Sequence, residues 1–190
     1  MMHAPSLDAS PWVRRFGAAV PPGEVLDLAC GGGRHARLFA GLGHPVLAVD
    51  RDPQALALAA GPGIATMRID LEVEGARWPF GAARFAGIVV TNYLHRPVLD
   101  DIVNSLAPDG VLIYETFALG NEAFGKPANP AFLLHPGELL ELAARGGLTV
   151  LAYEDGVLAL PKPARVQRIC AAGPGFLPIE GRLDHLVGRE

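Results

Sequence analysis

The chain has 190 residues and a net charge of −4, and half of its residues are hydrophobic. This composition argues against a disordered chain and fits one domain that can bury a sizeable core. The acidic balance gives no sign of a nucleic-acid partner. We therefore predict a single domain over residues 1–190, with its core at about residues 20–172.

Hydropathy and cysteine content narrow the class of protein further. No run approaches the roughly 20 apolar residues of a membrane span, and the N-terminal stretch lacks the apolar centre of a signal peptide. We expect a cytoplasmic protein without a membrane partner. Cys30 and Cys170 lie in apolar surroundings and are predicted to be buried thiols rather than a disulfide. We predict no metal site, and the sequence leaves the oligomeric state open.

The first expected elements are a short helix and a buried strand. Ser10 and Pro11 have the spacing of a helix cap followed by a proline in the first turn. The apolar run at 25–29, interrupted by Asp27, predicts a buried parallel strand. The glycines at 31–33 then allow a tight turn and a close backbone approach to a ligand, because they lack a Cβ atom.

Each of the next two expected strands ends in a carboxylate. A helix expected at 34–42 leads into a strand at 45–50, which ends in Asp50. A carboxylate at that place can accept hydrogen bonds from both hydroxyls of a ribose. Asp52 begins the next expected helix as its cap, and a third apolar segment ends at Asp70. The pattern indicates a nucleoside-binding βαβ unit.

Together these segments resemble the class I S-adenosylmethionine (SAM)-dependent methyltransferases. Residues 25–34, 48–53 and 68–72 (VLDLACGGGR, AVDRDP and RIDLE) are similar to the first three motifs of that superfamily. Residues 104–116, NSLAPDGVLIYET, are similar to the segment in which a turn feeds the fifth strand. The resemblance covers about residues 20–172, and within the superfamily the chain looks most like the small tellurite-resistance-type methyltransferases.

This resemblance implies an α/β fold, namely a Rossmann-like three-layer α/β/α sandwich. Its sheet would have seven strands and be mostly parallel, with an antiparallel last strand. Residues 107–110 predict a turn before the fifth strand. In the second half of the chain, the expected strands are 85–91, 111–117, 148–154 and 165–172, and the expected helices are 97–106 and 136–144.

The resemblance also implies that SAM is the cofactor and suggests how it is bound. Asp27 would meet the amino end of its methionine part, since a buried charge needs a partner. Gly31 and Gly33 would let the backbone approach the cofactor. Asp50 would bind the ribose hydroxyls, and Asp70 would bind the adenine amino group.

Candidate catalytic residues follow the fourth strand. In an open α/β sheet the ligand crevice lies outside the carboxyl ends of the strands. We therefore expect Asn92, Tyr93, His95 and Arg96 near the transferred methyl group. Tyr93 and His95 are candidate catalytic residues that orient or deprotonate the acceptor. The alternative for His95 is a capping or packing role at the next helix.

Further candidates for acceptor binding lie later in the chain, so that the substrate set comprises Asn92, Glu115 and Lys126. Glu115 falls at the carboxyl end of the fifth strand. The segment 117–134 is expected to be a lid, because loops longer than about 12 residues are usually functional or disordered. Lys126 within it is a candidate to bind an anionic group, and the alternative is a solvated lysine.

The expected function is SAM-dependent methyl transfer to a small-molecule acceptor. Such an enzyme holds the acceptor in line with the S–CH3 bond and excludes water, so it needs no local catalytic dyad. One alternative is a protein that binds SAM or its demethylated product without turnover. Another is an NAD-dependent oxidoreductase, although Asp27 beside the glycines would repel a pyrophosphate. The sequence does not identify the acceptor.

Overall fold

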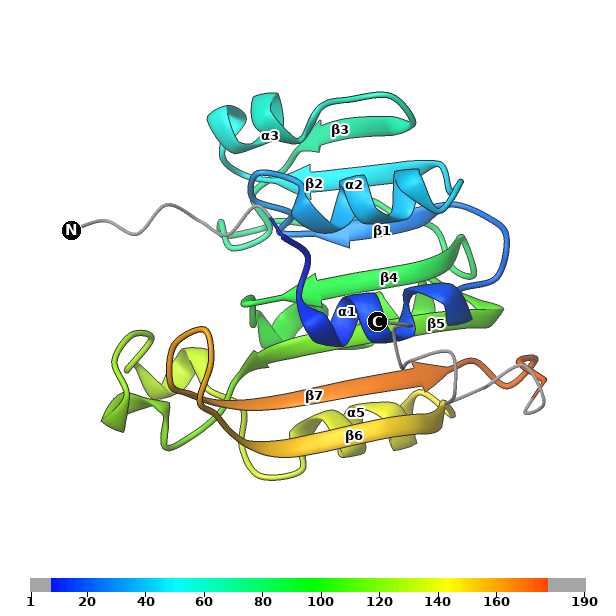
Figure 1. Cartoon of the computed structure of the whole chain (residues 1–190). Helices are drawn as coiled ribbons and strands as arrows, with labels where there is room; N and C mark the ends of the chain where they lie inside the picture. Colours follow the sequence, from blue (N-terminus) through cyan, green and yellow to red (C-terminus); the bar gives the residue numbers. More distant parts are fainter. Residues whose placement is uncertain (1–7, 178–190) are drawn as a thin grey trace, which may run out of the picture.

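The computed structural model describes residues 8–177 and is built on a seven-stranded sheet (Figure 1). In spatial order the strands are β3 (Ile64–Arg68), β2 (Val46–Asp50), β1 (Val25–Leu28), β4 (Phe85–Thr91), β5 (Leu106–Phe117), β7 (Ala164–Ala172) and β6 (Thr149–Leu158). Neighbouring strands are parallel except where β7 pairs with β5 and β6. The predicted mostly parallel sheet with an antiparallel last strand is confirmed.

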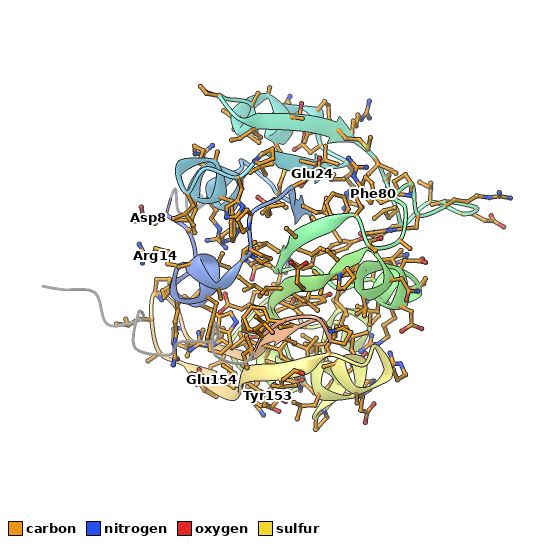
Figure 2. All side chains as sticks on the ribbon, turned by 90° about the vertical axis from the view of Figure 1, so that its right-hand side faces the viewer. Asp8, Arg14, Glu24, Phe80, Tyr153 and Glu154 are labelled. Carbon is orange, nitrogen blue, oxygen red and sulfur yellow. The ribbon has the colours of Figure 1, made fainter. Side chains whose placement is uncertain are left out.

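Helices cover both faces of the sheet. One face carries α1 (Pro11–Phe16), α2 (Arg34–Gly41) and α3 (Pro53–Ala59), and the other carries α4 (Leu99–Asn104) and α5 (Glu138–Arg145). Short 3₁₀ turns occur at η1 (Gly17–Ala19), η2 (Arg96–Val98), η3 (Asn121–Ala123) and η4 (Pro130–Phe132). Figure 2 shows the sheet between the α1 and α2 side and the α4 and α5 side. The predicted three-layer sandwich is therefore present.

The N-terminal helix is fixed to the sheet by both its cap and its core residues. The Ser10 side chain accepts the backbone N–H of Trp12, and Pro11 occupies the first turn, as predicted. The Trp12 ring is 1% exposed, and its indole N–H donates to the carbonyl oxygen of Ile169 at 3.2 Å. The start of α1 is thereby held at the carboxyl edge of the parallel strands.

Some predicted boundaries are wrong. β3 ends at Arg68, because the chain beyond it turns to place the carboxylate of Asp70 on the N–H of Glu72. The helix expected at 97–106 begins as the 3₁₀ turn η2 and ends at Asn104.

The turn expected at 107–110 is instead the irregular start of β5, where the pairing with β4 changes register. The oxygens of Pro108 and Gly110 accept the backbone N–H groups of Gly175 and Gly173. Hydrogen bonds from the chain after β7 therefore hold this irregular segment in place.

Two connections project beyond the carboxyl edge of the sheet (Figure 1). One is the hairpin between β6 and β7, whose strand pairing runs four residues past the predicted end at 154. The other is the segment 117–134, which is anchored by hydrogen bonds between Leu119 and Leu134 and between Leu134 and Phe117. Asn121 joins the two connections, because its side chain accepts the backbone N–H of Arg165.

No helix within residues 8–177 is long and apolar enough to cross a membrane. Of the tail that begins at Gly173, for which the sequence does not decide between wrapping the surface and meeting another subunit, residues 173–177 are described and bond to Gly110 and Pro108, and the rest lies outside the described residues.

Candidate active site

Two cavities lie side by side at the carboxyl edge of the sheet. The first, the cofactor-side cavity, has a volume of about 250 Å³. It is lined by Leu28, Ala29, Val49, Asp50, Arg51, Ile69, Asp70, Leu71, Glu72, Asn92 and Tyr93. The second, the acceptor-side cavity, has a volume of about 910 Å³ and reaches from the start of α1 to the β6–β7 hairpin. Asn92 lines both cavities and therefore marks their junction.

The carboxylate of Asp50 is held in place by the backbone. One of its oxygens accepts the N–H of Gly31 at 2.8 Å, and the other accepts the N–H of Asp52 at 2.9 Å. Each carboxylate oxygen can accept more than one hydrogen bond. Asp50 is therefore oriented into the cofactor-side cavity and keeps acceptor capacity for a ligand.

Asp70 and Tyr93 also line the cofactor-side cavity. Asp70 accepts the N–H of Glu72 at 3.0 Å, which orients its carboxylate. Burial, together with the nearby acids Glu72 and Asp70, raises the pKa of Tyr93 to about 12. Its phenol keeps its proton at neutral pH, so Tyr93 suits orientation by hydrogen bonding better than proton abstraction.

The glycine turn between β1 and α2 needs glycine for two different reasons. Gly31 has a φ of 52°, and a Cβ atom there would meet nothing within 4 Å. Gly33 has a φ of 76°, and a Cβ atom there would lie 2.6 Å from Ala59 of α3. The backbone conformation favours glycine at both positions, but only at Gly33 does packing also leave no room for a side chain.

Asp27 lies beneath the glycine turn and lines neither of these cavities. It is 1% exposed, and its carboxylate accepts the backbone N–H of Ala36 at 2.8 Å in the first turn of α2. Burial raises the pKa of Asp27 to about 7, against the lowering effects of that hydrogen bond and of Arg34. The structure thus gives Asp27 a partner within the protein, and the predicted contact with the cofactor stays a prediction.

Two non-glycine residues that line the cofactor-side cavity have left-handed backbone. Ala29 follows β1 with a φ of 53°, and Asn92 follows β4 with a φ of 55°. Left-handed backbone is uncommon for residues other than glycine and is often found at functional sites. The N–H of Asn92 donates to the carbonyl oxygen of Glu115 at 2.9 Å, which fixes the junction to β5.

Glu115 is part of a buried network in the wall of the acceptor-side cavity. One of its oxygens accepts the Ser10 hydroxyl at 2.8 Å, and the other accepts Nη1 of Arg168 at 3.2 Å. Arg168 also donates to Glu154 and stacks on the ring of Trp12, with its Cζ atom 4.7 Å from the ring centroid. The network ties α1 to β5, β7 and β6.

His35 extends this network to α2 and was missed by sequence reasoning. Its Nε2 atom accepts the backbone N–H of Ser10 at 3.1 Å, so the ring proton lies on Nδ1, which faces the Thr91 hydroxyl at 3.4 Å. Burial, assisted by Arg34, lowers the pKa of His35 to about 3, and the ring is neutral. Because its partners are distant in sequence, no local motif marks it.

His95 and Arg96 do not meet the candidate active site. His95 precedes the turn η2 and lines neither cavity. Arg96 forms a two-bond ion pair with Glu138, at 2.7 and 2.9 Å, and donates to the oxygens of Ala131 and Leu133. Although burial opposes ionisation of Glu138, the bonds from Arg96 hold its pKa below its usual value. Arg96 thus fastens the segment 117–134 to α5.

Lys126 and Phe124 of the segment 117–134 do line the acceptor-side cavity. Leu133 of the same segment is fully buried, whereas Phe124 and Phe132 are 38% and 46% exposed. The segment therefore packs through one end and leaves its aromatic rings accessible.

Both cysteines are buried free thiols, as predicted, and burial raises the pKa of Cys30, which disfavours a thiolate there.

A family model described as a methyltransferase domain matches residues 25–110, the segment that supplies the cofactor-side cavity. Residues 25–110 are thus similar to a methyltransferase domain, and residues 8–177 share the fold of solved SAM-dependent methyltransferases. SAM is the cofactor of these enzymes. The predicted fold is confirmed, and these similarities support the predicted superfamily, enzyme class and cofactor. No curated protein sequence matches the chain.

Solved structures share this fold. A SAM-dependent methyltransferase from Mesorhizobium loti has a TM-score of 0.68 and 19% identity, and the match covers 88% of this chain and 100% of that one. A TehB-like methyltransferase from Corynebacterium glutamicum has a TM-score of 0.60 and 23% identity, covering 87% and 89%. The 1,6-didemethyltoxoflavin-N1-methyltransferase of Burkholderia thailandensis, solved with 1,6-didemethyltoxoflavin and S-adenosylhomocysteine (SAH), has a TM-score of 0.60 and 23% identity, covering 86% and 76%.

Proposed function

We propose that the chain transfers the methyl group of SAM to a small-molecule acceptor. The observation that carries this proposal is the pair of cavities that meet at Asn92. The adenosine part of the cofactor fits the smaller cavity, with Asp50 on the ribose hydroxyls and Asp70 on the adenine. The acceptor occupies the larger one, and the methyl group crosses the junction. A similar fold that holds both SAH and a small acceptor, in the Burkholderia enzyme, supports this arrangement.

The residues of this chain would contribute orientation rather than covalent chemistry. When bound, SAM supplies an activated methyl group: the acceptor's lone pair bonds to its carbon, and the electrons of the broken S–CH3 bond stay on sulfur, leaving SAH. Placing the two reactants in line can contribute up to about 7–11 kcal/mol of the barrier. Asn92, which lines both cavities, would help to align the reactants, and the hydrogen bonds among Ser10, Glu115 and Arg168 would hold the adjoining wall in place.

Calorimetric titration with SAM, SAH and NAD tests the cofactor assignment. We expect Asp50→Ala to weaken SAM and SAH binding more than tenfold, because a charged hydrogen-bond partner contributes roughly 1.5–3 kcal/mol. Asp52→Ala is the matched control, because that carboxylate caps α3 and does not line the cavity. Unchanged affinity in a folded Asp50→Ala protein would falsify the ribose assignment. Binding of NAD in place of SAM would overturn the proposed function.

Turnover separates an enzyme from a protein that only binds the cofactor. Purified protein is incubated with SAM and a low-molecular-mass cell extract, and SAH is quantified. Formation of SAH that depends on both the extract and Asp50 supports the enzyme. Tight SAM binding without SAH formation from any acceptor pool would favour the non-catalytic alternative.

A further inference from the structure

Among the charged side chains that line the acceptor-side cavity, cations outnumber anions, although the chain as a whole carries a net charge of −4. The charged residues of its lining are Arg14, Arg34, Lys126, Lys162 and Arg168 on the basic side, and Asp8 and Glu115 on the acidic side. Arg168 and Glu115 bind each other, so their charges offset. The remaining lining has an excess of positive charge, which attracts an anion.

Both lysines of the chain contribute to this excess of positive charge. Only two of the 16 Lys and Arg residues in the sequence are lysines, Lys126 and Lys162, and both line this cavity. They come from the segment 117–134 and from the β6–β7 hairpin, which project from the same edge of the sheet (Figure 1). Nζ of Lys162 lies 3.5 Å from the point where Gly125 would carry a Cβ atom, beside Lys126. Within residues 8–177 neither lysine forms an ion pair.

Arginines enter from the opposite side of the cavity. Arg14 is exposed on α1 and projects from that side of the molecule, as does the nearby Asp8 (Figure 2). Arg34 is the first residue of α2, next to the glycine turn. The lysines and arginines therefore bracket the cavity from two loops and two helices. A ligand that spans it meets positive charge at both ends.

The size and the apolar part of the lining indicate an organic ligand. The volume of about 910 Å³ lies near the top of the range of roughly 300–1,000 Å³ for small-molecule sites, and an inorganic oxyanion would fill little of it. Phe124 and Leu160 present apolar surface to the cavity and are 38% and 81% exposed without a ligand. These side chains would cover the apolar body of an acceptor.

We propose that the methyl acceptor is an organic anion, with an apolar body against Phe124 and Leu160 and an anionic oxygen group held between Lys126 and Lys162. This inference rests on the proposed function, because it assigns the acceptor of the same site. Charge-assisted hydrogen bonds from two lysines would orient the acceptor before the methyl group is transferred. The attraction is partly screened, because both lysines are exposed.

The test uses two fluorescent probes that share the same aromatic rings. One is 8-anilinonaphthalene-1-sulfonate, an organic anion, and the other is N-phenyl-1-naphthylamine, which lacks the sulfonate. Their affinities are measured with and without saturating SAH. We expect the Lys126→Gln/Lys162→Gln double variant to bind the anion at least tenfold more weakly and the neutral probe within about twofold. The Lys126→Arg/Lys162→Arg variant keeps the charge and should retain anion binding.

Arg77→Gln is the matched surface control, since Arg77 is exposed and lines neither cavity. Anion binding that is unchanged in the double glutamine variant, or lost equally in Arg77→Gln, overturns the proposal. Equal loss of both probes also overturns it, because charge would not be the cause. The affinity for SAH is measured in the same samples. Lysine-dependent anion binding by a protein that does not bind SAH would support the anion site but would refute the proposed function.

Discussion

The two cavities differ in how they are built and in their charge. The cofactor-side cavity is formed within residues 28–93, at the ends of neighbouring parallel strands, and its carboxylates are held by backbone N–H groups. The acceptor-side cavity combines segments from residue 8 to residue 168, and its side chains are held by one another. The first is a property of the fold, whereas the second depends on how distant loops meet in this particular chain.

Their charges are complementary to the proposed ligands. Asp50, Asp70 and Glu72 line the cofactor-side cavity, with Arg51 as the single basic residue of its lining. A sulfonium cofactor is cationic, so acids suit its side, while the basic acceptor-side cavity suits an anion. Placing opposite charges on the two sides of Asn92 would favour one orientation of each reactant. Experiments that disturb one side and leave the other intact test this division.

The largest expected effect concerns the glycine turn. Gly33→Ala should lower the free energy of unfolding by about 2–5 kcal/mol, because it combines left-handed backbone with a Cβ atom pressed against Ala59 of α3. Gly31→Ala carries only the backbone cost of about 1–2 kcal/mol, because the space beside it is open. Urea unfolding of the two variants makes the comparison. Equal losses would show that contact with α3 is not what requires glycine at position 33.

The sequence predicted part of the cofactor-side cavity, because those features are local, although Asp27, Gly31 and Gly33 do not line it. A cap residue, a glycine turn or a carboxylate at a strand end is written in a few adjacent positions, and Asp50 and Asp70 do line the cavity. The seven strands could be placed for the same reason. The boundaries that failed, such as the turn expected at 107–110, depend on hydrogen bonds to residues after β7.

The acceptor-side cavity was predicted only in part, because its residues meet through the topology. Glu115 and Lys126 were identified as candidates, but Lys162, Ser10 and His35 were not. The ladder β5–β7–β6 places Glu115, Arg168 and Glu154 in register, and no sequence window contains all three. That both lysines of the chain lie in loops next to prolines was visible in the sequence, but their convergence was not.

A second prediction uses the buried acid beneath the cofactor-side cavity. Burial raises the pKa of Asp27 to about 7 in the folded protein, from an ordinary value of 3.8 that applies to the unfolded chain. Between about pH 4 and pH 7 the folded protein therefore binds more protons than the unfolded chain. Its contribution to stability is complete below about pH 4 and is lost as the pH rises towards 7. Asp27→Asn keeps an oxygen for the N–H of Ala36 and removes this dependence.

As the pH rises from 5 to 7, the wild type should lose about 2–3 kcal/mol of unfolding free energy that Asp27→Asn keeps. The stability of the variant relative to the wild type should therefore increase by that amount. Urea denaturation across this range measures the difference. A difference that stays constant with pH would mean that Asp27 is already ionised at pH 5 in the folded protein. It would also reopen a direct role for its charge in cofactor binding.

A third prediction uses the buried base on the acceptor side and has the opposite sign. The pKa of His35 is about 3 in the folded protein, below its ordinary value of 6.5, so the unfolded chain binds more protons between these values. Its contribution is complete above about pH 6.5 and is lost as the pH falls towards 3. Between pH 7 and pH 5 the wild type should lose about 2 kcal/mol of unfolding free energy through His35, and His35→Gln should not show this loss.

In the wild type the two trends oppose each other between pH 5 and pH 6.5, so each variant should reveal the slope of the other residue. The double variant Asp27→Asn/His35→Gln should have the flattest profile of the four proteins. If the slopes of the single variants do not add in the double variant, Asp27 and His35 are coupled through α2, and the two sides of the site are not independent.

The smallest expected effect is that of His95→Ala. Because His95 lines neither cavity, we expect SAH affinity, binding of the anionic probe and turnover of any acceptor found by screening to stay within about twofold of the wild type. Asn92→Ala is the contrasting variant: it should leave SAH affinity largely intact and lower turnover at least tenfold, since Asn92 lines both cavities at their junction. A large loss of turnover in His95→Ala, with cofactor affinity preserved, would instead support its predicted role as a base. The segment around η2 would then have to move towards the acceptor when both ligands are bound.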